Sequence, residues 1–116
     1  MIGIGVDIIR ISRFKSLSEK VLERIFTAEE RGIFMQKRIE SLAANFAAKE
    51  ALIKAMGKLF SWKEIEVLRD REGKPYLRLS GKTLKFIKDK GIGNIHLSLS
   101  HEGEYAIAFL ILEGGL

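Results

Sequence analysis

The sequence predicts an α+β fold in which an antiparallel-rich sheet packs on one long buried helix. Three observations lead to this prediction. One strand-like segment is followed by three helical ones, then by two strands, a helix and two more strands. The later strands come in neighbouring pairs, and one helical segment is almost entirely apolar. The length of 116 residues suits a single domain over residues 1–116.

The N-terminal segment 1–9, "MIGIGVDII", is apolar and rich in β-branched residues, which predicts a strand. Asp7 interrupts this apolar run. Aspartate often caps a helix or supplies a turn at the end of a strand, and this is one interpretation. The other is a functional carboxylate at the carboxyl end of the strand, where binding sites of α/β proteins tend to lie.

The next segment predicts a helix for which Ser12 is the N-cap. Ser16 and Ser18 are the positions at which this helix would divide into two. Its apolar residues recur at helical spacing, namely Phe14, Leu17, Val21 and Ile25. Successive residues turn by about 100°, so a continuous helix would gather three basic side chains in a narrow arc, namely Arg13, Lys20 and Arg24.

Two further helices follow in the first half. The capping box "TAEE", with Thr27 at the N-cap and Glu30 at N3, marks the start of the second helix. The third helix is expected from about Glu40 to Met56, ending at Gly57. It contains "NFAAKEALIKAMG" over 45–57, whose many alanines predict a buried helix that lets another backbone pack close.

The second half is dominated by strand patterns. "EIEVLRD" and "PYLRLS" flank "REGK" and predict a hairpin, with Pro75 opening an edge strand. "GKTLKFIKDKG" predicts a short amphipathic helix that ends at Gly91. "NIHLSLS" alternates between apolar and polar residues, as a half-buried strand does. "YAIAFLIL" is apolar on both faces and therefore predicts a central strand.

Charge and composition limit the possible functions. The net charge is +5, and residues 10–38 hold eight basic and four acidic residues, a difference of +4. This excess predicts an acidic partner, which is a nucleic acid, a phosphorylated ligand, an anionic membrane or an acidic protein. The absence of cysteine excludes disulfides and thiolate zinc sites. The N-terminus lacks the features of a signal peptide, and no apolar run could span a bilayer, so we expect a cytoplasmic location.

Two carboxylates are candidates for chemistry. Glu50 and Lys54 lie four residues apart on one helical face, where an exposed pair would contribute only a few tenths of a kcal/mol. In a buried helix, however, the carboxylate needs a cation or a metal as its partner. Asp7 and Glu50 together would suit Mg²⁺, which usually takes one or two carboxylates plus phosphate oxygens. The spacing does not show that the two carboxylates meet.

Four stretches, in this order and in a chain of this length, resemble the holo-acyl-carrier-protein synthases. They are "GIGVDIIRISRF", "FAAKEALIKAMG", "GKPYL" and "HLSLSHEGEYAIA". These enzymes form the small bacterial family of 4′-phosphopantetheinyl transferases. The resemblance covers nearly the whole chain, and its specificity lies in the combination of the aspartate motif with the "FAAKEA…KA-x-G" motif.

The resemblance implies an activity and a set of partners. The enzyme would transfer 4′-phosphopantetheine from coenzyme A to a serine of apo-acyl carrier protein, for fatty acid biosynthesis, and release adenosine 3′,5′-bisphosphate. It would require Mg²⁺, with Asp7 and Glu50 as the ligands. Lys54 would approach the phosphates, and Glu50 would activate the serine hydroxyl directly or through a water. The family implies a homotrimer with coenzyme A bound between neighbouring protomers.

The resemblance also assigns binding residues. His101 and the serines that precede it, including Ser100, would line the coenzyme A cleft. His96 is a surface or interface residue as readily as a catalytic one. The residues expected near the adenine are Gly73, Lys74 and Pro75. Two basic residues could hold the 3′-phosphate, namely Lys37 and Arg38. The expected docking surface for the acidic carrier protein consists of Arg10, Arg13, Lys20 and Arg24.

The chain departs from the family pattern in two places. Asn45 stands where many relatives have arginine, and Gly57 is followed by residues 58–60, "KLF", where many relatives continue with Thr-Gly. Two other functions are weighed against the transferase. A basic nucleic-acid-binding module would explain the charge, but the sequence lacks aromatic stacking motifs. A metal-dependent nucleotide hydrolase could use the same carboxylates. We expect neither nucleic acid nor membrane as a partner.

Overall fold

The computed structural model describes residues 2–34 and 39–115 and confirms the predicted α+β class. Its elements, in chain order, are β1 (Gly3–Arg10), the 3₁₀ helix η1 (Ile11–Phe14), α1 (Glu19–Ile25), α2 (Ala28–Phe34), α3 (Ile39–Met56), the 3₁₀ helix η2 (Trp62–Glu64), β2 (Ile65–Arg69), β3 (Pro75–Leu79), α4 (Gly81–Asp89), β4 (Ile92–Glu102) and β5 (Tyr105–Gly114).

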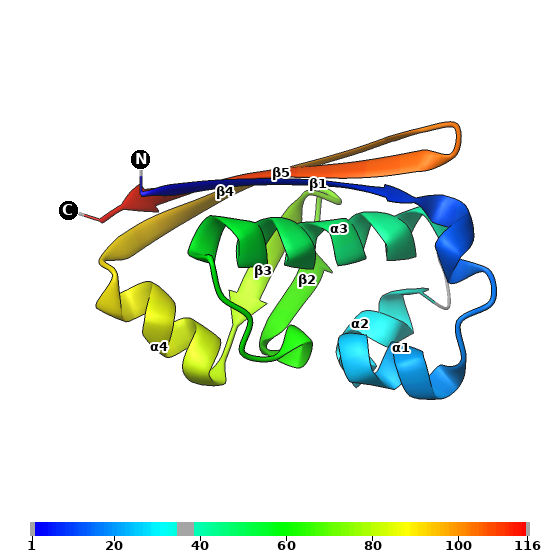
Figure 1. Ribbon diagram of the computed structural model, residues 1–116, viewed down its shortest axis with the longest axis horizontal. Helices are drawn as coiled ribbons and strands as arrows, with labels where there is room; N and C mark the ends of the chain where they lie inside the picture. Colours follow the sequence, from blue (N-terminus) through cyan, green and yellow to red (C-terminus); the bar gives the residue numbers. More distant parts are fainter. Residues whose placement is uncertain (1, 35–38, 116) are drawn as a thin grey trace.

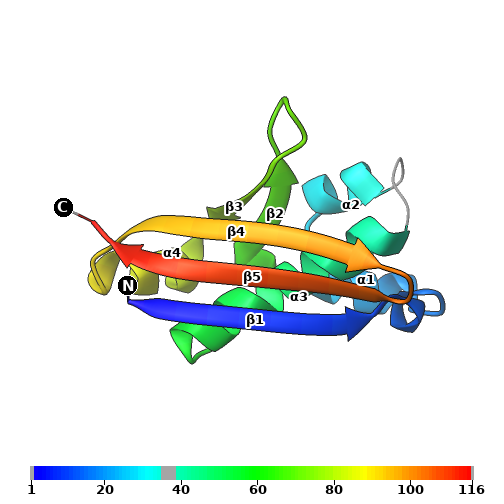
Figure 2. The same ribbon diagram turned by 90° about the horizontal axis from the view of Figure 1, so that it is seen from above.

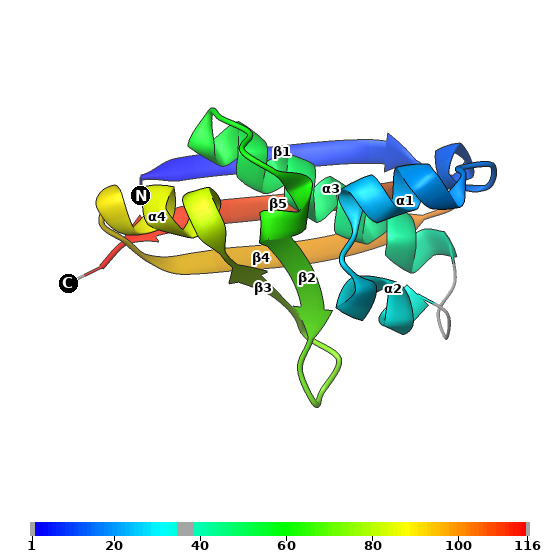
Figure 3. The ribbon, with the colours of Figure 1, turned by 90° about the horizontal axis from the view of Figure 1, so that it is seen from below.

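These elements form three layers (Figure 1). The first layer is an antiparallel sheet with the strand order β1-β5-β4, and its strands run side by side above α3 (Figure 2). The long helix α3 forms the middle layer. The antiparallel hairpin β2–β3 and the short helices α1, α2 and α4 form the third layer, on the other side of α3 (Figure 3). The helix α3 is therefore enclosed from two sides, as its sequence predicts.

Small residues allow α3 to approach β1 closely. A Cβ atom at Gly3 would lie 2.7 Å from the carbonyl oxygen of Ala55, and one at Gly5 would overlap the carbonyl of Ala51. Any side chain at these two positions would push the strand away from the helix. The glycines of "GIGVD" therefore permit close packing of the two backbones.

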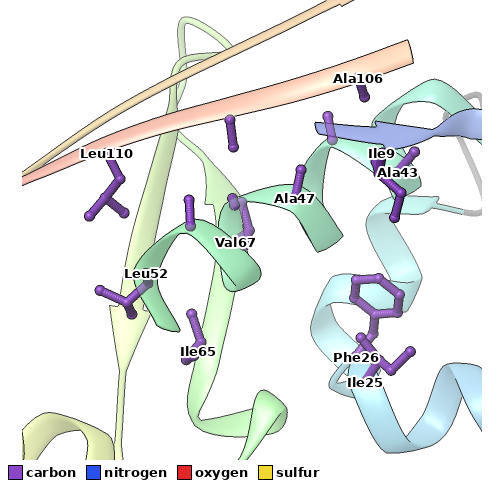
Figure 4. Close-up of a cluster of buried hydrophobic side chains, with 14 of the residues drawn as sticks. Ile9, Ile25, Phe26, Ala43, Ala47, Leu52, Ile65, Val67, Ala106 and Leu110 are labelled. Atoms are coloured by element: carbon purple, nitrogen blue, oxygen red, sulfur yellow. The ribbon is translucent and has the colours of Figure 1, made fainter. Parts of the chain in front are cut away.

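The core lies on both sides of α3 (Figure 4). Buried side chains of α3, such as Ala47 and Leu52, meet those of the sheet on one side and those of the hairpin on the other. Leu110 is an example from the sheet, and Ile65 and Val67 are examples from the hairpin. The predicted alternation in β4 is confirmed, because Ile95, Leu97 and Leu99 are half-buried while the residues between them are exposed. The fold thus fixes which face of β4 is free to line a site.

The central strand β5 buries only one of its two apolar faces. It lies between β1 and β4, as predicted, and Ala106, Ala108 and Leu110 are buried toward α3. On the opposite face, Ile107 and Phe109 are exposed. Neighbouring side chains of β1 and of the residue before it are also exposed, namely Ile2, Ile4, Val6 and Ile8. This face of the sheet is therefore an apolar surface that the described residues do not cover.

The structure decides one open alternative and corrects one prediction. The helix expected after Ser12 is divided, as Ser16 and Ser18 allowed, because Ser18 accepts a hydrogen bond from the backbone N–H of Val21 at 3.3 Å and caps a new helix, α1. Asp7 lies in the middle of β1 rather than at its carboxyl end, since pairing with β5 continues to Arg10. The other helix boundaries agree within a residue or two, and Gly57 ends α3 with a φ of +76°.

Among the described residues, no helix combines the length and the apolar character that crossing a membrane requires.

Candidate active site

Asp7 and Lys54 meet where β1 crosses the last turn of α3. The Lys54 ammonium donates to Asp7 Oδ1 at 2.9 Å and to the carbonyl oxygen of Val6 at 3.0 Å. The Asp7 side chain is 15% exposed, whereas that of Lys54 is 55% exposed. The carboxylate is therefore held close to α3 by a lysine whose long side chain remains accessible to solvent.

Glu50 has a different partner from Lys54. The indole N–H of Trp62 donates to Glu50 Oε1 at 3.2 Å. Trp62 is the first residue of η2, and its ring packs against Phe46 with ring centroids 6.2 Å apart. The Glu50–Lys54 pair that the spacing allows does not form. Instead, each of the two side chains contacts a residue from outside α3.

Lys49, the third charged residue of this helix segment, belongs to a buried ion pair. Its ammonium donates to Glu30 Oε1 at 2.8 Å, to the carbonyl of Ile25 at 2.7 Å and to that of Trp62 at 2.9 Å. Both charged side chains are 0% exposed. Burial raises the pKa of Glu30 and lowers that of Lys49, while their mutual attraction opposes both shifts. Lys49 is thus part of the protein interior rather than of the site.

The donor chemistry of Asp7 and Glu50 suits a hard cation. Both supply only carboxylate oxygens, which Mg²⁺ prefers, and Mg²⁺ commonly completes its shell with phosphate oxygens and waters. Within residues 2–34 and 39–115, no group of three or more acidic, histidine or cysteine side chains could hold a metal by itself. A metal at these two carboxylates would therefore need oxygens from a ligand.

A cavity of about 390 Å³ brings five predicted binding residues together. They come from the turn of the β2–β3 hairpin and from the end of β4, and they are Gly73, Lys74, Pro75, Ser100 and His101. The turn is held in shape by Asp70, whose side chain accepts from the backbone N–H groups of Glu72 and Lys74, each at 2.9 Å. Gly73 has a φ of +84°, which favours glycine at this position.

The cavity is basic. Among the described residues that line it, three carry basic side chains and none is an aspartate or glutamate. The basic residues are Arg69, Lys74 and His101, and the remaining polar lining comes from serines of α3 and β4. Such a lining suits an anion with several oxygens, such as a phosphate. Its use for coenzyme A stays a prediction.

The cavity and Asp7 lie at opposite edges of the sheet. Asp7 of β1 pairs with Ala108 of the central strand β5, and Ala108 pairs with Leu99 of β4, which lines the cavity. Two strand spacings separate β1 from β4, about 10 Å. The strand β5 and the buried alanines of α3 stand between the two groups of residues. One copy of the chain therefore does not join them into a single pocket.

The predicted docking residues are exposed but do not share one helix. Arg13 lies on η1, whereas Lys20 and Arg24 lie on α1, so the expected continuous arc is wrong. None of these three has a hydrogen bond or ion pair among the described residues. Arg10 lies in β1 and donates to Glu104 Oε2 and to the hydroxyl oxygen of Tyr105, each at 3.0 Å. The last two predicted binding residues, Lys37 and Arg38, lie outside the described residues.

Sequence reasoning missed three residues of this region. Lys49 carried a signal, because a lysine in an apolar helix needs a buried partner just as Glu50 does. Trp62 and Arg69 carried none, since their contacts with α3 depend on how η2 and β2 fold back on the helix. His96 lies on the open sheet face and contacts Glu113 at 3.0 Å; it does not line the cavity that His101 lines, but it borders a neighbouring one that shares Lys74 and Pro75.

Comparisons with known proteins identify the class and then the family. The model of the 4′-phosphopantetheinyl transferase superfamily matches residues 3–110. A protein of Halothermothrix orenii named holo-[acyl-carrier-protein] synthase is 42% identical, with 97% of this chain and 98% of that protein covered. The chain therefore belongs to this superfamily and, within it, to the family of holo-[acyl-carrier-protein] synthases.

Solved structures agree with this placement. The crystal structure of holo-[acyl-carrier-protein] synthase from Neisseria meningitidis has a TM-score of 0.86 at 37% identity, with 97% of this chain and 99% of that chain covered. The holo-(acyl-carrier-protein) synthase of Bacillus anthracis in complex with CoA (3′,5′-ADP) has a TM-score of 0.82 at 37% identity, with 98% and 97% covered.

Proposed function

We propose that the protein transfers 4′-phosphopantetheine from coenzyme A to a serine of apo-acyl carrier protein, as a step of fatty acid biosynthesis. The observation that supports this most is the basic cavity, which collects the hairpin turn and the end of β4 in a chain similar to holo-[acyl-carrier-protein] synthases. A cytoplasmic location follows from this proposal, because both substrates would be available there.

The transfer exchanges the phosphoanhydride bond of coenzyme A for a phosphodiester bond to serine. The serine oxygen bonds to the phosphorus that carries pantetheine, and the P–O bond to the second phosphate breaks. Adenosine 3′,5′-bisphosphate leaves. Mg²⁺ bound by Asp7 and Glu50 would supply positive charge to the pyrophosphate oxygens.

The protein's own residues position the reactants and move the proton. The Lys54 ammonium is accessible and can move from Asp7 to a phosphate oxygen, where it would balance the charge that develops on the leaving group. The carboxylate of Glu50, oriented by the indole of Trp62, would accept the proton of the serine hydroxyl directly or through a water. The cavity at β4 would bind the nucleotide part of coenzyme A.

A homotrimer would complete the site. The apolar face of the sheet is exposed in a single chain, and Asp7 lies at the β1 edge while the cavity lies at the β4 edge. We propose that neighbouring protomers cover the apolar face and bind coenzyme A between them, so that the carboxylates of one copy serve the cavity of the next.

The decisive assay measures the carrier directly. The protein is incubated with coenzyme A, Mg²⁺ and apo-acyl carrier protein, and the carrier is weighed by mass spectrometry. Addition of one phosphopantetheine group supports the proposal, whereas an unchanged carrier under every metal condition contradicts it. Salt-sensitive binding of DNA or RNA without transfer would favour the nucleic-acid module, and cleavage of coenzyme A without a carrier would favour the hydrolase.

The metal assignment has its own test. Chelation by EDTA should abolish transfer, and Mg²⁺ should restore it. Asp7→Ala and Glu50→Ala should each lose most of the turnover and bind Mg²⁺ more weakly in calorimetry, while circular dichroism shows a folded protein. Near-normal turnover of either variant at saturating Mg²⁺ would remove that residue from the metal site.

The docking surface for the carrier protein is tested by charge reversal. Arg13 and Arg24 are exposed and have no partner among the described residues. The variant Arg13→Glu/Arg24→Glu should raise the KM for the acidic carrier protein, because association would lose electrostatic steering. A raised KM for coenzyme A instead would assign these arginines to the other substrate.

A further inference from the structure

We propose that Arg69, held in position by Asn45, binds a phosphate group of the nucleotide in the basic cavity. This inference rests on the proposed function, because it takes coenzyme A as the ligand. Arg69 is the last residue of β2 and lines the cavity together with Lys74 and His101. None of the residues predicted from the sequence to bind coenzyme A lies on β2.

The hydrogen bonds of Arg69 leave its charge without a counterion. Its Nη2 donates to Asn45 Oδ1 at 2.6 Å, and its Nη1 donates to the carbonyl oxygen of Leu68 at 3.3 Å. Both acceptors are neutral. Among the described residues, Arg69 forms no ion pair with a carboxylate, although its side chain is half-buried. Burial lowers the pKa of the guanidinium, yet arginine remains charged in proteins.

Other arginines of the chain provide a contrast. Arg10, Arg31 and Arg78 are each within 3.2 Å of a carboxylate oxygen, and Arg78 bridges Glu29 and Glu66. Arg10 and Arg78 are exposed, and Arg31, which is half-buried like Arg69, has two carboxylate neighbours, Glu19 and Glu23. Arg69 is thus a half-buried arginine without a carboxylate partner among the described residues, and its side chain borders a cavity that contains two further basic groups.

Asn45 is placed so as to orient Arg69 without neutralising it. It lies on α3 with 0% exposure, and its amide oxygen faces the guanidinium. Reversing the amide would direct its N–H groups at the arginine donors, so the orientation is fixed. The amide nitrogen is then left buried without a hydrogen-bond partner, which is unfavourable for folding. Because the Asn45 amide is neutral, it holds the Arg69 guanidinium in place while leaving its full positive charge available to a ligand.

A phosphate is the anion that fits this arrangement. The planar guanidinium can donate two parallel hydrogen bonds to phosphate oxygens, and its remaining N–H groups have no acceptor among the described residues. Lys74 and His101 can contact the same group or a neighbouring one. Coenzyme A carries a 3′-phosphate and a pyrophosphate, and both present the oxygens that this cation would bind.

Two variants test the proposal by isothermal titration of coenzyme A. Arg69→Gln removes the charge and should weaken binding about ten- to a hundredfold. Asn45→Asp keeps an oxygen in the same place but supplies a carboxylate, so Arg69 stays in position with its charge neutralised. We expect weaker binding of coenzyme A by this variant too, with an unchanged or higher Tm. A merely structural role for the Asn45–Arg69 contact predicts normal binding by Asn45→Asp.

The matched control is Arg71→Gln. Arg71 lies on the turn that follows Arg69 in the β2–β3 hairpin. It is exposed and does not line the cavity. Its removal changes the net charge by the same amount as Arg69→Gln, and we expect its affinity for coenzyme A to stay within about twofold of the wild type. An equal loss of affinity in Arg71→Gln would show that total charge, rather than the position of Arg69, controls binding, and this would overturn the proposal.

Dephospho-coenzyme A, which lacks the 3′-phosphate, identifies the group that Arg69 contacts. If Arg69→Gln weakens coenzyme A but not dephospho-coenzyme A, the contact is with the 3′-phosphate. Equal weakening of both ligands assigns it to the pyrophosphate. If Arg69→Gln binds both ligands with wild-type affinity, the proposal for Arg69 is overturned. The proposed function is unaffected by that result as long as the wild type transfers phosphopantetheine. Absence of coenzyme A binding to the wild type would instead contradict both.

Discussion

Trp62 connects the buried ion pair to the candidate catalytic carboxylate. Its backbone carbonyl accepts from the Lys49 ammonium at 2.9 Å, and its indole N–H donates to Glu50 Oε1 at 3.2 Å. The position of Glu50 therefore depends on a residue that is itself anchored in the protein interior. Adjacent residues of α3, Lys49 and Glu50, are joined through this one tryptophan, although they point to different sides of the helix.

Replacing Trp62 by phenylalanine separates these two contacts. Trp62→Phe keeps the aromatic packing on Phe46 and the backbone carbonyl, but it removes the N–H that orients Glu50. We expect kcat to fall about tenfold, because a hydrogen bond to a charged group contributes about 1.5–3 kcal/mol, while the Tm changes little. Steady-state kinetics and a thermal melt measure the two effects. Unchanged kcat would mean that Glu50 does not need this donor.

The single tryptophan also gives a spectroscopic signal. Because its indole contacts Glu50, adding Mg²⁺ to the wild-type protein already mixed with coenzyme A should change the tryptophan fluorescence. Glu50→Gln should lose this response. A full response in that variant would place the metal elsewhere.

At the scale of elements, the buried ion pair holds three parts of the fold together. Glu30 of α2 accepts from the Lys49 ammonium of α3 and, at 3.0 Å, from the backbone N–H of Val67 in β2. The capping box at the start of α2 involves the same carboxylate, which accepts from the N–H of Thr27 at 3.1 Å. One buried carboxylate thus satisfies donors from α2, α3 and β2.

Removing one partner of this pair should be more harmful than removing both charges. Lys49→Met leaves the Glu30 carboxylate buried without its cation, and we expect a loss of about 3–5 kcal/mol in the free energy of unfolding. Adding Glu30→Gln removes the unpaired charge and should recover part of that loss. Urea unfolding of the two single variants and the double variant measures the coupling. A double variant less stable than Lys49→Met would refute this account.

A second carboxylate stabilises the start of α4. Ser80, the N-cap of this helix, makes no capping hydrogen bond with its side chain, and Glu64 of η2 accepts instead from the Thr83 backbone N–H at 3.0 Å and hydroxyl at 2.8 Å. These two hydrogen bonds, the backbone one first, lower the pKa of Glu64. A cap from outside the helix replaces the local one.

This lowered pKa makes the cap sensitive to acid. A carboxyl whose pKa is lower in the folded state stabilises the fold above its unfolded pKa, near 4.5, and that contribution disappears as the pH falls through the lowered value. Glu64→Gln should therefore lose less stability than the wild type between pH 7 and pH 3. Urea midpoints at pH 7, 5 and 3 test this expectation. Parallel pH profiles of the two proteins would exclude a contribution from Glu64.

The elements that depend on local patterns were predictable. Strict alternation in β4, the capping box of α2 and the apolar segment of α3 each specify an element within a few residues. The division of the first helix depended on whether Ser18 would cap a new helix, which spacing alone does not decide. In the candidate site, residue types and motifs favour Asp7, Glu50 and Lys54, whose roles stay predictions. Their partners come from elements distant in sequence, so Lys54 binding to Asp7 and Trp62 binding to Glu50 could not be read from spacing.

At the scale of the whole molecule, the open face of the sheet is the main unsatisfied feature. Single exposed apolar residues are ordinary, but here Ile4, Val6 and Ile8 of β1 lie beside Ile107 and Phe109 of β5. A contiguous apolar patch of this kind marks an interaction surface. The other face of the same sheet packs on α3, so the patch is available only to another molecule (Figure 1). A second copy of the chain is the partner that the proposed homotrimer requires.

A charge in the centre of this face should separate the protomers. Phe109 is 42% exposed on the central strand and lies opposite Val6 and Ser98, so Phe109→Glu places a carboxylate in the proposed interface without disturbing the core. We expect the wild type to have the mass of a trimer in light scattering and the variant that of a monomer. Because the cavity and Asp7 lie at opposite sheet edges, the monomer should also lose phosphopantetheine transfer.

The control for this experiment is Lys88→Glu on α4, an exposed position in the layer on the far side of α3 from the sheet. It introduces the same side chain and should leave both mass and activity unchanged. Asp7→Asn mixed with Arg69→Gln gives a further test, because each variant damages a different part of the proposed shared site. In a mixed trimer, a site can combine the intact carboxylates of an Arg69→Gln protomer with the intact cavity of an Asp7→Asn protomer. The mixture should therefore transfer faster than either variant alone. A mixture no faster than its components would contradict a site shared between protomers.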